Sequence, residues 1–232
     1  MSLISPGAGV PRVLDGSDPV AIVEAGRLLR LGQVVVIPTD TGYGIAAGLF
    51  HPTAVDRVYD IKQRDTALRL PLLIATAADL PLVASDIPDT AWRLINKFWP
   101  GPMSLVLPAT AAVPRSVTDG RGTVAIRVPN GRACLQLLEF MGEPVTGTSA
   151  NLSGRPGALT ASDAVDQVGA VVDAILVDDS AVVQNKASTV VELQGGTLTI
   201  HREGALSADL LRGAAAPRMA AGMQLISSRN RR

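Results

Sequence analysis

A short polar stretch, residues 148–154, holds side chains well suited to bind an anion. Ser149 and Asn151 are two residues apart, so on an extended backbone they point to the same side. A hydroxyl and an amide each donate hydrogen bonds to phosphate or carboxylate oxygens without carrying charge. The stretch follows a short predicted strand, and α/β proteins place ligands at strand ends. Serine, asparagine and glycine also form ordinary turns, so this stretch alone leaves a site and a turn equally open.

Further charged or hydroxyl side chains lie at the ends of apolar segments. Arg127 interrupts the apolar run 123–129, and a buried guanidinium needs a partner. We interpret it as a ligand for a carboxylate or a phosphate, because its planar fork matches either anion. The other members of this set lie in loops or close to the ends of elements: Thr41, Lys62, Arg64, Ser188 and Arg202.

Simpler interpretations of three of these cations stay open. Lys62 and Arg64 follow a predicted helix, and the helix dipole favours cations at that end. Arg202 could pair on the surface with its neighbour Glu203.

Several kinds of site are not supported by the spacing. His51 and His201 are far apart, which gives too few ligands for zinc and no evident base for Ser149, so no metal site is predicted. The run GYGIAA at 42–47 formally matches a dinucleotide fingerprint, but the next predicted helix begins near residue 52. Cations and neutral donors suit phosphoryl or nucleotidyl transfer, in which positioning and charge neutralisation accelerate the reaction.

The composition predicts a globular α/β protein. Of the 232 residues, 47% are hydrophobic and only 3% aromatic, so valine, leucine, isoleucine and alanine must fill the core. Cys134 is the only cysteine, and its apolar neighbours predict a core thiol. There is no signal-peptide pattern and no apolar run near the ~18–20 residues that span a bilayer. We therefore expect a cytoplasmic protein without membrane contact.

The net charge is zero but unevenly distributed. Residues 213–232 contain four arginines and no acid, which leaves the rest of the chain at about −4. A body with that balance is a poor general nucleic-acid binder. The basic tail could bind RNA weakly.

Hydrophobic periodicity predicts helices and strands that alternate along the chain. We expect helices, the first capped by Asp18, at 19–30, 52–61, 88–98, 132–141, 162–168 and 208–212. Strands are expected at 34–37, 70–74, 104–107, 123–128, 145–146, 175–177, 189–192 and 198–201, with a polar loop over 38–48.

This order predicts an α/β fold with a twisted, open mixed sheet and helices on both sides. No linker divides the chain, so we expect one domain over 17–212. A flexible lead-in over 1–16 and a flexible basic tail over 213–232 complete the expected organisation.

In combination, these motifs resemble those of the YrdC-type threonylcarbamoyl-adenylate synthases, in their single-domain form. The resemblance covers residues 17–212, with the motifs in order: PTDTGYG at 38–44, KQR at 62–64, WPGP at 99–102, VAIRVP at 124–129, TSANLSG at 148–154, STV at 188–190 and REG at 202–204.

The resemblance implies an open α/β fold around a concave, cationic cavity. It also implies a nucleotidyl transfer in which L-threonine, bicarbonate or CO2, and ATP give L-threonylcarbamoyl-adenylate and pyrophosphate. The product would feed the tRNA threonylcarbamoyl-transferase complex, which forms threonylcarbamoyl-adenosine in tRNA.

Roles for individual residues follow from the resemblance. The threonine pocket would contain Thr41, Arg127, Ser149 and Ser188. ATP, accompanied by Mg²⁺, would be held by Lys62, Arg64, Thr123, Asn151 and Arg202. The catalytic group would comprise Lys62, Arg64, Ser149 and Asn151.

Two positions depart from the family pattern. Leu70 stands where the family usually has lysine or asparagine, and Ala75 stands about where it often has histidine. These departures affect one ATP contact and one threonine contact that the resemblance implies, and Arg69 in the longer loop could reach a phosphate instead. Two other functions stay open: a non-catalytic RNA-binding relative, and a carbamoyl-adenylate enzyme of the hydrogenase-maturation kind.

Overall fold

The computed structural model describes residues 10–63, 69–118, 120–178 and 186–216. Its central strand, β2 (Val35–Thr39), is buried along its whole length. Successive side chains of a strand point to opposite faces, and both faces of β2 are apolar. Val35 and Ile37 join one hydrophobic cluster and Val36 joins the other. Helices therefore cover both sides of β2, which pairs in parallel with one neighbouring strand and antiparallel with the other.

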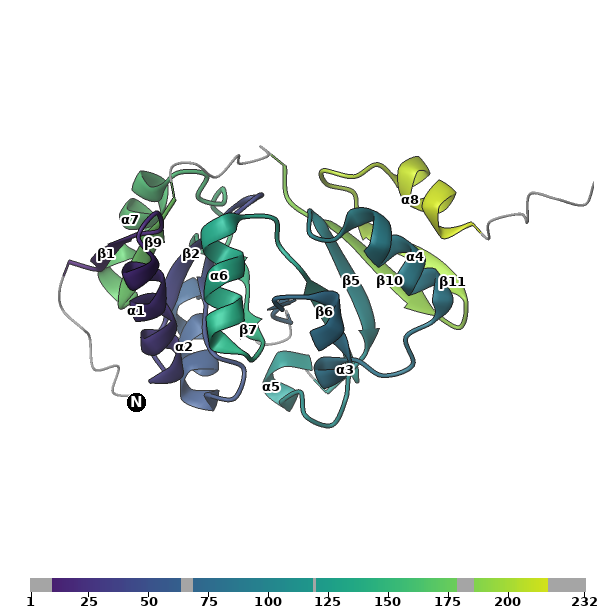
Figure 1. Ribbon diagram of the computed structural model, residues 1–232, viewed down its shortest axis with the longest axis horizontal. Coiled ribbons are helices and arrows are strands. Elements are labelled where there is room, and N and C mark those ends of the chain that lie inside the picture. Colours follow the sequence, from purple (N-terminus) through teal and green to yellow (C-terminus); the bar gives the residue numbers. More distant parts are fainter. Residues whose placement is uncertain (1–9, 64–68, 119, 179–185, 217–232) are drawn as a thin grey trace, which may run out of the picture.

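Two mixed sheets form the framework, whereas the sequence predicted one (Figure 1). The five-stranded sheet has the order β1 (Arg12–Asp15), β9 (Ala174–Val177), β2, β3 (Gly42–Ala46) and β8 (Thr148–Ser149). The six-stranded sheet has the order β11 (Thr197–Arg202), β10 (Thr189–Gln194), β5 (Met103–Pro108), β6 (Thr123–Arg127), β4 (Leu72–Leu73) and β7 (Val145–Thr146). The predicted α/β class with mixed strands is confirmed.

The helices lie against these sheets according to their apolar faces. Helices α1 (Pro19–Arg30) and α6 (Arg132–Met141) share one cluster with β2 and β9. The opposite cluster contains residues of α2 (Pro52–Lys62), α3 (Leu80–Val83), α4 (Asp89–Phe98), α5 (Arg115–Thr118), α7 (Ala161–Val168) and α8 (Ala208–Ala215). In Figure 1, α1 and α6 lie over the five-stranded half of the molecule, and α4 and α8 lie beside the other half.

Local sequence accounts for the best-predicted helix ends. The Asp18 side chain accepts a hydrogen bond from the Val20 backbone N–H at 2.8 Å and caps α1, as predicted. Helix α6 ends at Gly142, whose φ of 64° lies in the left-handed region that glycine adopts without strain.

Three strands lie where the sequence predicted none. β1 falls in the predicted lead-in, so that prediction is wrong for Arg12–Asp15, which pair in parallel with β9. β3 falls in the predicted polar loop, and the short β8 falls in the polar stretch after β7. These segments are glycine-rich, polar or short, and neighbouring strands rather than periodicity determine their conformation.

Other boundaries shift by small amounts. β4 has only two residues, fewer than predicted. Helix α8 continues to Ala215, so the predicted start of a flexible tail at residue 213 lies inside a helix. The remaining domain limits stay predictions.

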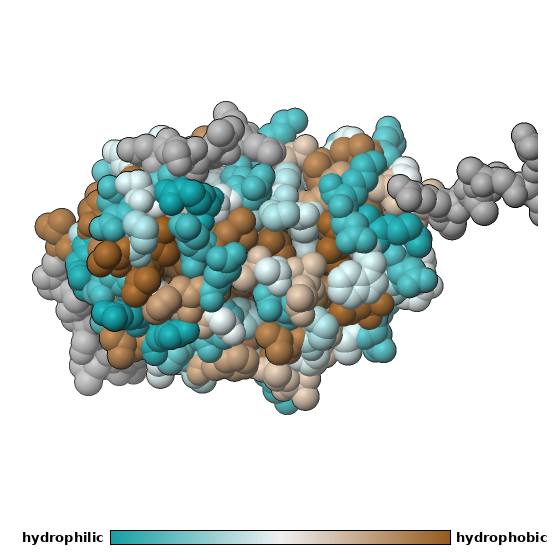
Figure 2. Space-filling model, in the orientation of Figure 1, coloured by the Kyte–Doolittle hydropathy of each residue, from teal (hydrophilic) through white to brown (hydrophobic). Residues whose placement is uncertain are grey.

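Hydrophilic and hydrophobic side chains both contribute to the surface. Figure 2 shows hydrophilic and hydrophobic residues interspersed over the face turned to the viewer. Within the described ranges, no helix combines the length and apolar character that a bilayer crossing requires.

Candidate active site

A cavity opens between the two sheets, and residues from both line it. It gathers five of the residues singled out in the sequence: Thr41, Arg127, Ser149, Ser188 and Arg202. Arg127 is directed there by strand alternation, because its neighbours Val124 and Ile126 in β6 belong to the apolar core on the other face. The other lining residues are Thr39, Gly42, Tyr43, Gly44, Pro71, Leu73, Ser104, Gly147, Thr148 and Ala187.

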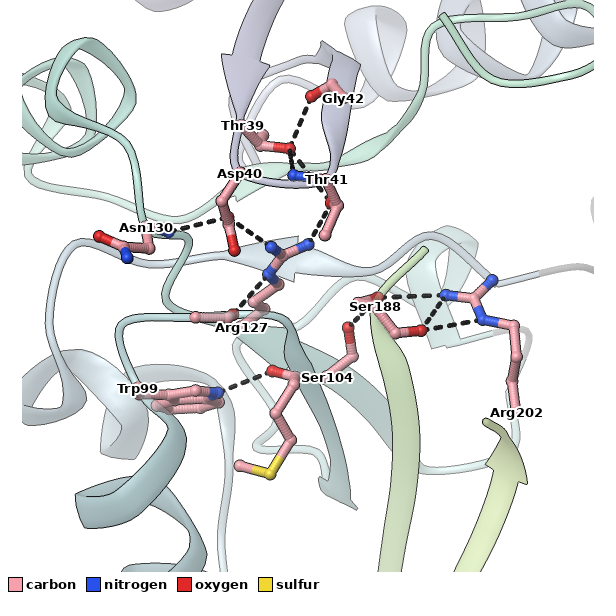
Figure 3. A network of polar contacts seen from close by, with 12 residues as sticks. Thr39, Asp40, Thr41, Gly42, Trp99, Ser104, Arg127, Asn130, Ser188 and Arg202 are labelled. Atoms are coloured by element: carbon pink, nitrogen blue, oxygen red, sulfur yellow. Dashed lines mark hydrogen bonds and ion pairs between the residues drawn. The ribbon is translucent and has the colours of Figure 1, made fainter. Parts of the chain in front are cut away.

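Arg127 is held from three directions by the protein (Figure 3). Its Nε donates to the Gly101 carbonyl at 2.8 Å and its Nη1 to the Thr41 hydroxyl at 2.8 Å. Its Nη2 donates to Asp40 Oδ1 at 2.5 Å. A guanidinium has five N–H donors. Two of them thus have no partner among the described residues, at a side chain that lines the cavity.

Asp40 is the ionic partner of Arg127, and the pair is almost completely buried. The two side chains are 4% and 6% exposed, and Asp40 Oδ1 also accepts from the Asn130 backbone N–H at 2.9 Å. Burial lowers the pKa of Arg127, and the negative charge of Asp40 opposes that shift. The buried guanidinium therefore has its partner within the protein, and its ligand role stays a prediction.

A second arginine lies at the other end of the network in Figure 3. Arg202 donates to the Ser188 carbonyl through Nε at 3.0 Å and Nη2 at 2.9 Å, and to the Ser188 hydroxyl at 3.1 Å. The Ser188 hydroxyl lies 3.0 Å from that of Ser104. Partial burial lowers the pKa of Arg202. Within the described ranges no ion pair joins Arg202 to an acid, so pairing with Glu203 is not observed.

A buried lysine, Lys62, holds the polar stretch after β7 through hydrogen bonds to Ser149 and Asn151. Lys62 is 2% exposed, and its Nζ donates to the Ser149 carbonyl at 2.6 Å and the Asn151 carbonyl at 3.0 Å. It also donates to Asn151 Oδ1 at 2.8 Å, which accepts from the Ser149 hydroxyl at 2.6 Å. The stretch contains both a short strand and a turn, but Lys62 and Asn151 do not line the cavity.

The two remaining predicted residues are Thr123 and Arg64. Thr123 begins β6, does not line the cavity, and its hydroxyl accepts a hydrogen bond from Arg69. Arg64 lies outside the described residues. Their predicted contacts with ATP are not tested by this arrangement.

Comparison with known proteins identifies the family. The family model of the Sua5, YciO and YrdC proteins, described as telomere recombination, matches residues 27–204. That range includes most of both sheets and every residue lining the cavity.

The chain belongs to the Sua5/YciO/YrdC family.

Relatives within this family carry a consistent name. A Pyrococcus abyssi protein named threonylcarbamoyl-AMP synthase is 35% identical over 182 residues, which are 78% of this chain and 53% of that protein. A Mycobacterium tuberculosis protein, provisionally given the same name, is 35% identical over 199 residues, covering 84% of this chain and 91% of its own length. The chain thus spans about half of the archaeal relative and most of the mycobacterial one.

Solved structures agree with the family assignment. The crystal structure of P. abyssi Sua5 complexed with L-threonine superposes with a TM-score of 0.83 at 30% identity. The match covers 89% of this chain and 61% of that one. The predicted resemblance to the YrdC type is therefore confirmed.

The two departures from the Sua5/YciO/YrdC pattern lie away from the cavity lining. Leu70 is fully buried in the apolar core. Ala75 lines a separate hollow between the end of β4 and the C-terminal end of α6, together with Thr76 and Glu143. In this member of the family, neither side chain lines the cavity between the sheets.

Sequence reasoning missed two residues of the site. Asp40 was noted only as part of a polar motif, although a buried arginine could have prompted a search for an acid. Ser104 was read as the start of a strand; β5 alternation places it opposite Leu105, on the cavity side. The predicted core position of Cys134 is confirmed, and burial raises the pKa of its thiol to about 12.

Gly147 leaves room for a cavity-lining leucine, and filling that room should disturb the site. A Cβ at residue 147 would lie 2.4 Å from Leu73 Cγ. We expect Gly147→Ala to reduce the free energy of unfolding by about 1–3 kcal/mol because Leu73 must move. Chemical denaturation measures this. Gly213→Ala in α8 is the control, since its Cβ meets nothing within 4 Å, and it should be neutral or stabilising by up to about 1 kcal/mol. Equal destabilisation by Gly147→Ala and Gly213→Ala would show that contact with Leu73 is not the cause.

Proposed function

We propose that this protein is an L-threonylcarbamoyl-adenylate synthase, which converts L-threonine, bicarbonate or CO2, and ATP into threonylcarbamoyl-AMP and pyrophosphate. The observation that carries the proposal is the convergence of Arg127, Thr41, Ser188 and Arg202 on one cavity in a chain of this family. The names of the relatives and the L-threonine complex of P. abyssi Sua5 support it.

The amino acid would bind at the Arg127 end of the cavity. Three bonds orient the guanidinium, and its two remaining donors suit the two oxygens of a carboxylate. The Thr41 hydroxyl accepts from Arg127 and lies 3.3 Å from the Thr39 hydroxyl, whose own proton is donated to the Gly42 carbonyl. A substrate oxygen would take the Thr41 proton in place of this long contact. Ser149 and Ser188 supply further hydroxyls to the threonine pocket.

The nucleotide phosphates would lie towards Arg202, which has no acidic partner within the described ranges. The carbamate oxygen of N-carboxythreonine attacks the α-phosphorus of ATP, the bond from that phosphorus to the bridging oxygen breaks, and pyrophosphate leaves. Arg202 would offset the negative charge that grows on the leaving group. Contacts of Lys62, Arg64, Thr123 and Asn151 with ATP belong to the proposal as well.

Mg²⁺ would enter as part of the ATP substrate. The described residues contain no cluster of three or more histidine, cysteine, aspartate or glutamate side chains that could hold a metal. Its ligands would thus come mainly from the phosphates and water, as is common for Mg²⁺. Delivery of the product to a tRNA threonylcarbamoyl-transferase complex, cytoplasmic location and weak RNA binding by the tail are further parts of the proposal.

The reaction is tested by substrate omission. We expect purified protein with ATP, Mg²⁺ and bicarbonate to release pyrophosphate only when L-threonine is present, and the rate to fall in Asn151→Ala. Threonine-independent release, or none although ATP binds, would contradict the proposal. Salt-sensitive RNA binding without turnover would instead favour the non-catalytic relative.

A further inference from the structure

The two arginines that line the cavity differ in how much positive charge they offer a ligand. Arg127 forms a buried ion pair with Asp40, so the charges of that end nearly cancel. Arg202 is bonded only to uncharged oxygens, all of them on Ser188, within the described ranges. The cavity therefore has an almost neutral end at Arg127 and a cationic end at Arg202; Figure 3 shows the two arginines with their partners.

What distinguishes Asp40 from an asparagine at the same position is its negative charge, not its hydrogen bonds. Its Oδ1 accepts both from Arg127 and from the Asn130 backbone N–H. Its Oδ2 is buried and has no hydrogen-bond partner among the described residues. The amide oxygen of an asparagine would accept the same two bonds, so the buried carboxylate supplies nothing further except its negative charge. A buried polar atom left unpaired is costly and calls for an explanation.

That charge acts differently on the two kinds of substrate in the proposed reaction. Free threonine is a zwitterion, so its ammonium and carboxylate feel opposite effects from Asp40. Pyrophosphate and the ATP phosphates carry several negative charges, so the same carboxylate repels them strongly at low effective dielectric. Specificity arises from such a difference in affinity, often through a repulsive element.

We propose that Asp40 is a specificity-determining residue that keeps phosphate groups away from Arg127 and so reserves its free donors for the carboxylate of the amino acid. This inference rests on the proposed function for the identity of the two substrates. Polyphosphate is directed to the Arg202 end because, of the two arginines that line the cavity, Arg202 is the one without an acidic partner among the described residues. Without Asp40, Arg127 becomes a second phosphate site, and pyrophosphate competes with threonine.

Direct binding of inorganic pyrophosphate tests the inference without requiring turnover. Calorimetric titrations compare wild type, Asp40→Asn, Arg127→Gln and the double variant. We expect Asp40→Asn to bind pyrophosphate about tenfold or more tightly, or with a second site, because a nearby negative charge is removed. The gain should be absent in the double variant, since it acts through Arg127. A thermal melt verifies that each variant folds.

A second ion pair provides a matched control. Asp173 Oδ2 accepts from Arg57 at 2.5 Å and from the Val34 backbone N–H at 2.8 Å, outside the cavity lining. Asp173→Asn should leave pyrophosphate affinity unchanged. The inference is overturned if Asp40→Asn binds pyrophosphate like wild type, or if its gain survives in the double variant. Failure of wild type to bind L-threonine in the same assay would count against the proposed function instead.

Discussion

Replacing Arg127 by lysine is expected to lower kcat/KM for L-threonine by about 100-fold or more, because lysine cannot reproduce the planar fork. Arg127 makes three separate bonds, to Gly101, Thr41 and Asp40, and a single ammonium cannot reach all three with the same geometry. The loss should appear mainly as a raised KM for threonine if the side chain holds the ground-state carboxylate. Initial rates of pyrophosphate release at varied threonine measure it.

The alanine variant of Arg127 is expected to lose stability as well as binding. Arg127→Ala leaves the buried carboxylate of Asp40 without a counter-charge, which should cost about 3–5 kcal/mol of unfolding free energy. Arg57→Lys is the control for Arg127→Lys. Arg57 Nη1 lies 2.5 Å from Asp173 Oδ2, and neither residue lines the cavity. Arg57→Lys should leave kcat/KM unchanged. Equal losses of kcat/KM in Arg57→Lys and Arg127→Lys would remove the special role assigned to Arg127.

Replacing Lys62 by methionine is expected to destabilise the protein by about 3 kcal/mol and to reduce kcat at least tenfold. The change keeps the length of the side chain but leaves three acceptors, the Ser149 carbonyl and two oxygens of Asn151, without their buried donor. The segment that positions Ser149 in the cavity should loosen as a result. Chemical denaturation and initial rates at saturating substrate measure the two effects.

The same substitution at an exposed lysine, Lys97, is the control for Lys62→Met. Lys97 lies exposed on α4, so Lys97→Met should change the free energy of unfolding by less than about 0.5 kcal/mol. If Lys62→Met kept full stability and full kcat, the buried lysine would have no part in holding the segment. If stability fell but kcat did not, the role of Lys62 would be structural alone.

Sequence patterns predict the helices of this fold better than its sheets. Helices α1 and α6 are predicted with both ends correct, because apolar periodicity coincides with local end signals at Asp18 and Gly142. β1, β3 and β8 are not predicted, because a short or glycine-rich strand is defined by the strand beside it. The division into two sheets depends on pairings such as that of β3 with β8, which periodicity does not contain.

Site residues are predicted as a set more readily than their partners. Five of the nine predicted residues line one cavity, because polar side chains at strand ends of an α/β fold tend to converge. The pairing of Arg127 with Asp40 links residues 87 positions apart, so spacing along the chain cannot reveal it. For Lys62 the sequence leaves two interpretations open, a cation at a helix end and an ATP ligand, whereas in the structure its buried ammonium donates to the segment 149–151.

The most direct test of the central claim is transfer of labelled carbon from bicarbonate into a nucleotide product. Wild type and Arg127→Lys are incubated with [14C]bicarbonate, ATP, Mg²⁺ and L-threonine, and the products are separated by chromatography and weighed by mass spectrometry. The account predicts a labelled species with the mass of threonylcarbamoyl-AMP in wild type, strongly reduced in the variant and absent without threonine. Pyrophosphate formed without any labelled adenylate, or equal product from both proteins, would contradict it.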